Sequence, residues 1–296
     1  MKIVIVGSES FVGRELKKQC RTRCLEVIGL DLVNGEDTAT IVADIRSSAV
    51  ADAIPEGADA IVHLAAISRD QDCKRDPVGA FDVNVKGVLN LIAAAQAKKV
   101  KQFIFASSEW VYGNSKDGES QREDDPIDVN KVVGEYALTK LVGERMLAMA
   151  HSRGLCPVTV LRFGIIYGPR PKPMCAPEGI FNEVKTLDPL EMKGSLSSGR
   201  CFIHVSDVAD GILATLGHPG YEVFNLCGNR LVTFREIIEE SKKIHGKNPK
   251  VIETDPSAIN VRNPDNTKFR KTFNWAPKLD IAQGLATLLA FQQGRS

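Results

Sequence analysis

Short β-branched runs alternate with longer helical patterns along the first half of the chain. The expected strands cover residues 2–6, 25–30, 40–43, 59–64, 101–107 and 157–163. This alternation predicts a parallel sheet, because parallel strands need helical crossovers between them. Parallel strands are covered on both faces and are therefore apolar along their whole length, as Ile-Val-Ile-Val at 3–6 is. The pattern predicts an α/β fold with a doubly wound sheet of the Rossmann type.

The texture of the chain changes after Tyr167. Gly-Pro-Arg-Pro-Lys-Pro follows, and this stretch breaks both helix and strand, which marks an exit from the main domain. Helix and strand patterns resume at 205–216 and 222–226, and a helical portion follows over 233–293. We expect two parts: a Rossmann domain of residues 1–168 plus a returning segment at about 200–228, and a smaller C-terminal substrate-binding lobe of residues 169–199 plus 229–296.

Charge and cysteine content exclude several classes of partner. The 38 Lys and Arg balance 37 Asp and Glu, so a formal charge of +1 offers no field to attract nucleic acid or an anionic membrane. The seven cysteines are scattered singly, without CxxC pairs or neighbouring histidines, which argues against a disulfide framework or a metal site. The start, MKIVIVG, is typical of a strand rather than a signal peptide, and no apolar stretch approaches membrane-spanning length. We expect a cytoplasmic protein whose partner is a small molecule, without metal, membrane or nucleic acid.

A turn framed by Gly7 and Gly13 joins the first strand to the first helix. In this context backbone N–H groups at a helix N-terminus bind a pyrophosphate. Ser10 stands where another glycine is expected and its Cβ would crowd the pyrophosphate, so a plain tight turn is the alternative interpretation. Asp31, at the end of the second strand, favours a dinucleotide, because its carboxylate can accept hydrogen bonds from both ribose hydroxyls of the adenosine half. The same carboxylate repels a 2′-phosphate and residues 32–37 hold no Arg or Lys, so the predicted cofactor is NAD.

A phenol and an ammonium group lie four residues apart at Tyr136 and Lys140, on one face of a predicted helix that runs to about His151. A free tyrosine has a pKa near 10, so roughly one in a thousand is ionised at pH 7, and a neighbouring cation lowers that pKa. The alternative is a surface pair of neighbours. Ser108 favours the functional interpretation, because it ends a predicted strand at the sheet edge where ligands bind.

Taken together, these residues resemble the extended short-chain dehydrogenase/reductase family. The similarity is to its NAD-dependent nucleotide-sugar epimerase/dehydratase branch, which includes UDP-glucose 4-epimerase, and it covers nearly the whole chain. The matching segments are Gly7 to Gly13, Asp31, Asp44-Ile45, His63 to Ala66, Asn84 to Gly87, Ser107 to Gly113, Tyr136 to Lys140, Leu161 to Pro169 and Arg200 to Asp207.

The resemblance implies a role for each group of residues. Tyr136 takes a proton from a sugar hydroxyl while the adjacent carbon gives hydride to NAD, Ser108 shares that proton, and Lys140 binds the nicotinamide ribose and stabilises the phenolate. His63 has a structural role, and Asn84 braces the sheet. The implied cofactor-binding residues are Gly7, Ser10, Phe11, Val12, Gly13, Asp31, Asp44, Ile45, Leu64, Ala65, Ala66, Tyr136 and Lys140.

Several departures from the family pattern concern the substrate. Ile165 replaces the asparagine that holds the sugar or diphosphate, and the usual Arg-x-Gly-Asp before the last helices is missing. Arg200 matches an arginine that reaches the nucleotide phosphates, and Arg262 lies close enough in sequence to replace the missing element, although both fit surface arginines too. Glu109 is either a substrate contact, like Ser108, or a solvated turn carboxylate.

Trp110 bears on the type of reaction. The dehydratases of this branch follow the catalytic hydroxyl with Asp then Glu, and this chain has Glu109 then Trp110, so half of that machinery is absent. The first hypothesis is an NAD-dependent nucleotide-sugar epimerase acting at C4 through a keto intermediate. The alternatives are a dehydrogenase or ketoreductase of a nucleotide sugar or simple sugar, and a non-catalytic NAD-binding regulator.

We also expect a homodimer, because the helices around 81–98 and 136–149 carry apolar residues on more than one face.

Overall fold

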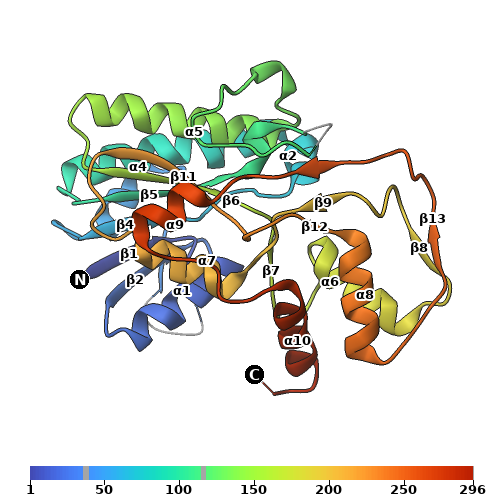
Figure 1. Ribbon diagram of the computed structural model, residues 1–296. Coiled ribbons are helices and arrows are strands. Elements are labelled where there is room, and N and C mark those ends of the chain that lie inside the picture. The colour runs from blue at the N-terminus through green and yellow to red at the C-terminus, as the bar shows by residue number, and fades with distance from the viewer. Residues whose placement is uncertain (36–39, 115–117, 296) are drawn as a thin grey trace. The chain divides into compact units, whose positions relative to one another are not determined.

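A seven-stranded sheet dominates the computed structural model, which describes residues 1–35, 40–114 and 118–295 (Figure 1). The strands lie in the order β11-β6-β5-β4-β1-β2-β3, with the bounds Tyr221–Leu226, Val158–Phe163, Phe103–Ser108, Ala60–His63, Lys2–Val6, Glu26–Asp31 and Thr40–Val42. Neighbouring strands from β5 to β3 pair in parallel. The predicted parallel Rossmann-type fold is confirmed.

The central strands are apolar because both faces of the sheet are covered. Every residue of β4, β5 and β6 is buried, and in β1 only Lys2 is partly exposed. Helices α4 (Gly87–Ala97) and α5 (Glu135–Ser152) lie on one face of the sheet, and α1 (Phe11–Thr22) lies on the other (Figure 1). The resulting core fixes the carboxyl ends of the strands, where the predicted site residues follow.

The chain forms two compact units. The first contains Met1–Val111, Pro126–Arg162 and Ala209–Phe224, and the second contains Tyr112–Asp125, Phe163–Val208 and Asn225–Ser296. The segment that returns to the first unit begins at Ala209. The change from the first unit to the second after β6 follows Arg162, before the proline-rich stretch.

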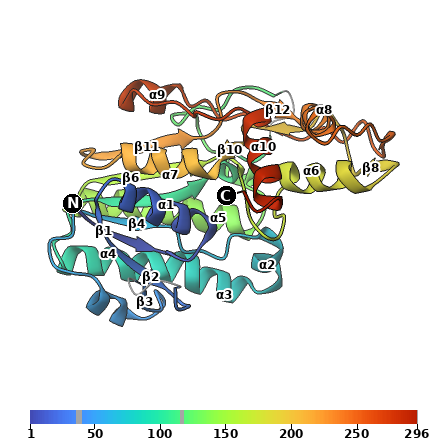
Figure 2. The same cartoon turned by 90° about the horizontal axis from the view of Figure 1, so that it is seen from below.

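The second unit is built from short strands and four helices among its described residues. Three small sheets have the orders β10-β7, β12-β9-β14 and β13-β8. The strand bounds are β7 Ile166–Tyr167, β8 Leu190–Met192, β9 Gly199–Arg200, β10 Ile203–His204, β12 Val232–Thr233, β13 Val251–Glu253 and β14 Val261–Arg262. Helices α6 (Ala176–Thr186), α8 (Phe234–His245) and α10 (Ile281–Gln292) pack on one another around a second core (Figure 2).

The helical portion expected over 233–293 is only partly correct. It contains α8, α9 (Thr267–Phe273) and α10, but also β13 and β14, whose two or three residues are too short to show a period. Side-chain caps fix the helix ends: Thr233 accepts a hydrogen bond from the Glu236 N–H at the start of α8. The remaining elements are η1 Ser48–Ala53, α2 Asp70–Arg75, η3 Glu109–Tyr112, η4 Val129–Lys131 and α7 Val205–Ala214.

A long helical run precedes β5. Helix α3 (Pro77–Phe81), the π-helical turn η2 (Asp82–Lys86) and α4 join into 21 residues that are long and apolar enough, by length and composition, to cross a membrane. This corrects the expectation that no stretch has such a length. Because 44% of its most apolar window is buried, and Val88 and Leu91 belong to the core of the first unit, we assign the run as a core helix.

Candidate active site

The turn after β1 requires glycine at both of its ends. Gly7 has a φ of 87°, and a Cβ there would lie 2.6 Å from the backbone nitrogen of Ala65. A Cβ on Gly13 would lie 2.3 Å from the carbonyl oxygen of Gly7. The N–H groups of Leu64 and Ala65 donate to the Val6 carbonyl at 2.8 and 2.9 Å, which holds the segment after β4 against the turn. Ala66 follows, half-buried.

Ser10 caps helix α1. Its hydroxyl donates to the Gly7 carbonyl at 2.7 Å and accepts from the Gly13 N–H at 3.1 Å. Phe11 and Val12 are the first helical residues. Ser10 was expected to crowd the pyrophosphate and, from the resemblance, to bind the cofactor. Its capping role was not predicted, although serine before a helical pattern is a common N-cap signal.

Asp31 lies at the end of β2 and is fixed beside the glycine turn. Its Oδ2 accepts from the Glu9 N–H and its Oδ1 accepts from the Leu32 N–H, each at 2.8 Å. Sequence reasoning missed Glu9, whose buried carboxylate pairs with Lys17 and accepts from the Thr40 hydroxyl at 2.7 Å. Of the residues after Asp31 that the cofactor argument used, 36 and 37 lie outside the described residues.

Asp44 and Ile45 follow β3. Arg46 donates to both Asp44 oxygens, with Nε at 3.0 and 2.9 Å, and this hydrogen bonding holds the pKa of Asp44 below its usual value. Ile45 packs on Gly87, where an added Cβ would lie 2.6 Å from its Cδ1, and its carbonyl accepts from the Asn90 side chain at 2.8 Å. Ile45 is thus a core residue whose position is tied to α4.

Ser108, Tyr136 and Lys140 come together at the carboxyl end of β5. Ser108 is the last residue of that strand, and its hydroxyl is hydrogen-bonded to the Tyr136 phenol. The Lys140 ammonium is buried, 5.0 Å from the centre of the Phe105 ring and 5.8 Å from that of Tyr136. The three groups therefore lie as the acid/base interpretation requires, not as a surface pair of neighbours.

The pKa of the phenol differs from the sequence expectation. Burial raises the pKa of Tyr136 to about 12, against a smaller lowering by the hydrogen bond from Ser108, so the phenol is protonated at neutral pH. Burial lowers the pKa of Lys140 to about 8. His63 lies beneath, between Phe103 and Phe105, and burial followed by the charge of Lys140 lowers its pKa to about 3. A neutral, buried His63 agrees with a structural role.

Asn84 connects the helix of Tyr136 to the segment after β4. It lies in η2, accepts from the Ile67 N–H at 2.9 Å, and donates to the Ile67 carbonyl at 3.0 Å and the Thr139 hydroxyl at 3.1 Å. The Thr139 hydroxyl in turn donates to the Tyr136 carbonyl at 2.8 Å. These partners differ from the sheet backbone expected from the resemblance. A π-helical turn is frequent at functional sites, and this one aims Asn84 at the α5 helix.

Glu109 is fully buried in η3, so the alternative of a solvated turn carboxylate is wrong.

Sequence reasoning also missed a buried ion pair behind the site. Arg162 on β6 donates to Glu144 on α5 with Nε at 3.0 Å and Nη2 at 2.8 Å, and the Ser107 hydroxyl donates to the same carboxylate. Neither Glu144 nor Arg162 carries a sequence signal, because the contact joins segments that are distant along the chain.

Arg200 and Arg262 lie side by side in the second unit. Their strands, β9 and β14, pair in parallel with these two residues in register. Arg200 donates to the carbonyl of Gly199 at 2.7 Å, and to the carbonyl and side-chain oxygen of Asn260 at 2.6 and 2.7 Å. Arg262 is 5% exposed, so it is not the surface arginine of the alternative interpretation. Two arginines at neighbouring backbone positions are a candidate site for an anion such as a diphosphate, although the Arg200 guanidinium already donates to Gly199 and Asn260.

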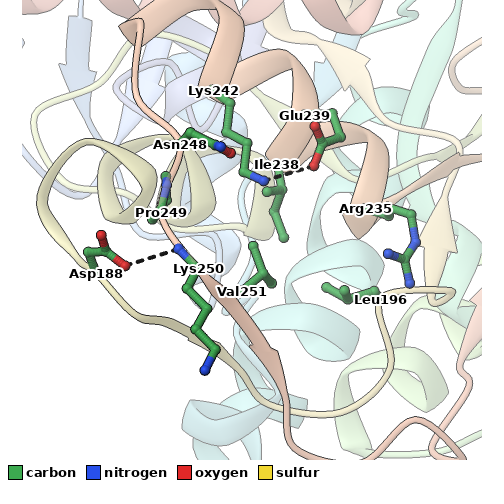
Figure 3. A pocket seen from close by; sticks show the side chains of 10 residues that line it. All are labelled: Asp188, Leu196, Arg235, Ile238, Glu239, Lys242, Asn248, Pro249, Lys250 and Val251. Carbon is green, nitrogen blue, oxygen red and sulfur yellow. Dashed lines mark hydrogen bonds and ion pairs between the residues drawn. The ribbon is translucent and has the colours of Figure 1, made fainter.

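A cavity of about 550 Å³ lies elsewhere in the second unit, between α8 and β13 (Figure 3). Its lining contains none of the predicted site residues. Lys242 pairs with Glu239 at 3.1 Å, and Arg235 lies 3.9 Å from Glu253. Two of the three cations that line this cavity, Lys242 and Arg235, are thus paired with or close to carboxylates.

The first unit fits a dinucleotide. Gly7 and Gly13 let the turn pack closely on its own backbone and on the segment after β4. The N-terminus of α1 provides the electrostatic attraction for a pyrophosphate, and the Asp31 carboxylate lies beside the turn for a ribose. Ser108, Tyr136 and Lys140 place two hydroxyl groups beside a buried cation, an arrangement that suits proton transfer. The arrangement suits hydride chemistry on an alcohol carbon.

Comparison with known proteins is consistent across sequence and structure. Residues 3–227 match the family model described as the NAD dependent epimerase/dehydratase family. A UDP-glucuronate 4-epimerase of Thermodesulfobacterium geofontis is 28% identical over 232 residues, 76% of this chain and 70% of that protein. A dTDP-glucose 4,6-dehydratase of Streptomyces griseus is 31% identical over 246 residues, 79% of this chain and 72% of that protein. The UDP-glucose 4-epimerase of Thermus thermophilus in complex with NAD superposes with a TM-score of 0.86 at 23% identity, covering 100% of both chains, which shows the shared fold.

Proposed function

Because the chain belongs to the NAD-dependent epimerase/dehydratase family, we propose that it is a nucleotide-sugar epimerase that inverts C4 through a transient keto sugar. Its cofactor is NAD, and the family consists of enzymes. The observation that carries the proposal is the hydrogen-bonded Ser108–Tyr136 pair beside the buried Lys140. These three residues can move the proton of the sugar hydroxyl and return it, so the proposed epimerisation needs no further acid or base.

The residues act in a simple order. Tyr136 accepts the proton of the sugar hydroxyl in its phenolate form, which Lys140 and the positive ring of bound NAD would favour against the burial that raises its pKa to about 12. Ser108 donates a hydrogen bond to the developing alkoxide. Lys140, with a pKa of about 8, is mostly protonated at neutral pH and stabilises the phenolate. NAD, when bound, supplies the hydride acceptor. After the keto sugar turns over in the site, hydride would return from the reduced cofactor to the opposite face of C4, and Tyr136 returns the proton to the C4 oxygen, so the cycle has no net redox change.

Elimination of water is not part of this proposal. The dehydratase pattern places Asp and Glu after the catalytic hydroxyl, and Trp110 occupies the position of that Glu. Glu109, fully buried next to Ser108, is proposed as a substrate contact without a second acid to expel a leaving group.

The proposed substrate carries a nucleotide diphosphate held by Arg200 and Arg262. Support comes from their register on β9 and β14. Relatives also point this way: a UDP-glucuronate 4-epimerase is among them, and MoeE5, 23% identical with a TM-score of 0.88, was solved with UDP-glucuronic acid and NAD. A second candidate is an NAD-dependent dehydrogenase or ketoreductase, which Ile165 favours because it replaces the asparagine expected to hold the sugar or diphosphate.

A panel of nucleotide sugars separates the two candidates. The purified protein is incubated with UDP- and dTDP-sugars, the products are separated by chromatography, and NADH absorbance is followed in parallel. An epimer formed without net absorbance change supports the epimerase. Stoichiometric NADH formation with a single oxidised product overturns it in favour of the dehydrogenase.

A cytoplasmic homodimer is also proposed. An apolar groove on the helical run is lined by Pro77, Val78, Phe81, Val85 and Leu89 with two charged residues at its edge, and the side chains of Val78 and Leu89 are 78% and 46% exposed. Burying this surface against a second copy removes apolar area from water. Sedimentation at micromolar concentration tests this, and a monomer contradicts it. The scattered, odd number of cysteines supports a reducing compartment.

A further inference from the structure

A buried ion pair between α5 and β6 is the centre of a hydrogen-bond network that also includes β5 and β11 of the first unit. Glu144 and Arg162 are 2% and 4% exposed, and their side chains make two hydrogen bonds of 3.0 and 2.8 Å. Ser107, also buried, donates to the Glu144 carboxylate. The Tyr221 hydroxyl donates to the Glu144 backbone carbonyl at 3.1 Å. Through the side chain and backbone of Glu144, helix α5 is therefore hydrogen-bonded to β5, β6 and β11.

Such a pair is a poor way to stabilise a fold. Removing two charges from water costs about as much as their attraction returns, and apolar residues of the same volume are often as stable or more so. The network therefore calls for an explanation beyond stability, and its neighbours supply one.

The residues of this network lie close along α5 and β5 to Tyr136, Lys140 and Ser108. Glu144 is one helical turn after Lys140 and two turns after Tyr136, so all three share a face of α5. Ser107 directly precedes Ser108 on β5. Between these contacts the helix approaches the strand closely, since a Cβ on Gly143 would lie 2.6 Å from the Phe105 ring.

We propose that Glu144, held by Arg162 and Ser107, is a positioning residue that sets the distance between Ser108 on β5 and Tyr136 on α5 and provides the anionic environment of Lys140. This inference rests on the proposed hydride-transfer function. A shift of α5 along β5 by a fraction of a turn separates the Ser108 hydroxyl from the phenol, and misplacement of about 1 Å lowers rates about 100-fold.

The electrostatic part depends on the titratable groups near Lys140. Among the described residues these are Tyr136 and Glu144 on α5, Cys73 on α2 and His63 on β4, with Arg162 paired to Glu144 from β6. Burial lowers the pKa of Lys140 to about 8, and Cys73 and Glu144 oppose that lowering. Without the Glu144 carboxylate, the pKa of Lys140 falls further, and its charge is lost at lower pH.

The first test needs neither substrate nor cofactor. Lysine labelled with ¹³C at Cε is titrated by NMR, and the Lys140 resonance is assigned by its absence in Lys140→Met. In Glu144→Gln we expect the Lys140 midpoint to move to lower pH. The double variant Glu144→Gln/Arg162→Met, which removes both charges and so avoids an unpaired buried guanidinium, gives the same direction. Unchanged midpoints in both variants overturn the electrostatic part.

The second test uses turnover of the substrate that the nucleotide-sugar panel identifies. Glu144→Gln is expected to lower kcat about 10- to 100-fold, while the dissociation constant of NAD stays within about threefold. The matched control is Gln102→Met, because Gln102 is equally buried directly before β5 and bonds Thr159 at 3.0 Å and Thr215 at 2.8 Å. This control loses comparable buried hydrogen bonds at the opposite end of the strand, and its kcat and Lys140 midpoint stay as in the wild type.

The outcomes separate this inference from the proposed function. If the wild type turns over no sugar of the panel, the proposed function fails, and the NMR midpoints still test the link between Glu144 and Lys140. If Gln102→Met and Glu144→Gln lower kcat equally, and only in proportion to their loss of folded protein, then Glu144 is structural and the positioning role is overturned.

Discussion

The two units hold their functional candidates in different ways. In the first, Ser108, Tyr136 and Lys140 lie on a six-residue strand and an 18-residue helix, braced from behind by Glu144 and Asn84. In the second, Arg200 and Arg262 lie on strands of two residues, held mainly by loop groups. If the proposed roles hold, the proton-transfer geometry depends on long elements of the sheet domain, whereas the proposed anion site depends on short strands and loops. Substitutions should therefore affect chemistry in one unit and binding in the other.

The sharpest test of the comparison is Tyr136→Phe. It removes the proton acceptor and keeps the ring packing, so turnover falls at least about 100- to 10,000-fold while NAD affinity stays within about twofold. Steady-state kinetics and calorimetry with NAD measure the two effects. Activity within about a factor of two of the wild type contradicts the mechanism.

The corresponding change in the second unit is Arg200→Ala. A charge-assisted hydrogen bond contributes about 1.5–3 kcal/mol, so the dissociation constant of a nucleotide sugar rises roughly 10- to 150-fold with NAD binding unchanged. Arg200→Lys is the control, because it keeps the charge and loses the planar donors that bond Asn260. If calorimetry detects no nucleoside diphosphate binding to the NAD-loaded wild type, the nucleotide-sugar assignment is wrong and a simple-sugar dehydrogenase takes its place.

Asp31→Ala tests whether binding and chemistry also separate within the first unit. Loss of the ribose hydrogen bonds weakens NAD about 10-fold or more, and kcat at saturating NAD changes less. Part of the loss has another source, since Asp31 also fixes the Glu9 N–H beside the glycine turn. The exposed Asp52 provides a control carboxylate in Asp52→Ala. Equal NAD affinity in both variants removes Asp31 from the site.

The smallest expected effect compares one buried histidine in each unit. The pKa of His63 is lowered to about 3 and that of His204 to about 4, mainly by burial, so both bind a proton more readily in the unfolded chain. Stability is therefore complete above about pH 6.5 and falls as the pH drops towards 4, by about 1.4 kcal/mol per pH unit for each histidine. Denaturant unfolding at several pH values measures this slope. His63→Leu should reduce it by about one proton, and an unchanged slope contradicts the assignment of a neutral, buried His63.

The long, regular strands and helices of the molecule were predictable from the sequence. The strands from 2–6 to 157–163 match β1 to β6 within two residues, and the helix of Tyr136 ends at Ser152, one residue after the expected His151. Asp31 and Ser108 could be placed at strand ends for the same reason, because parallel strands are apolar throughout and stop at polar residues.

What sequence reasoning missed depends on contacts between distant segments. Glu144 and Arg162 look like a helix-surface carboxylate and an interrupted apolar strand until the fold brings them together. β9 and β14 are too short to show a pattern, so the register of Arg200 with Arg262 could not be foreseen. Ser10 is different: its capping signal was present in the sequence, but Ser10 was interpreted as a departure from a motif and as a cofactor-binding residue, not as a cap.

The buried Glu144–Arg162 pair has a consequence for engineering this enzyme. A screen for thermostable variants rewards the replacement of such a pair by well-packed apolar side chains, because the desolvation of two ions is then avoided. The same replacement removes the anchor between the helix and the strand that share the catalytic groups. Selection for heat resistance alone should therefore enrich variants at Glu144 and Arg162 that are more stable but have a lower kcat. Libraries that are meant to keep turnover should leave these two residues unchanged.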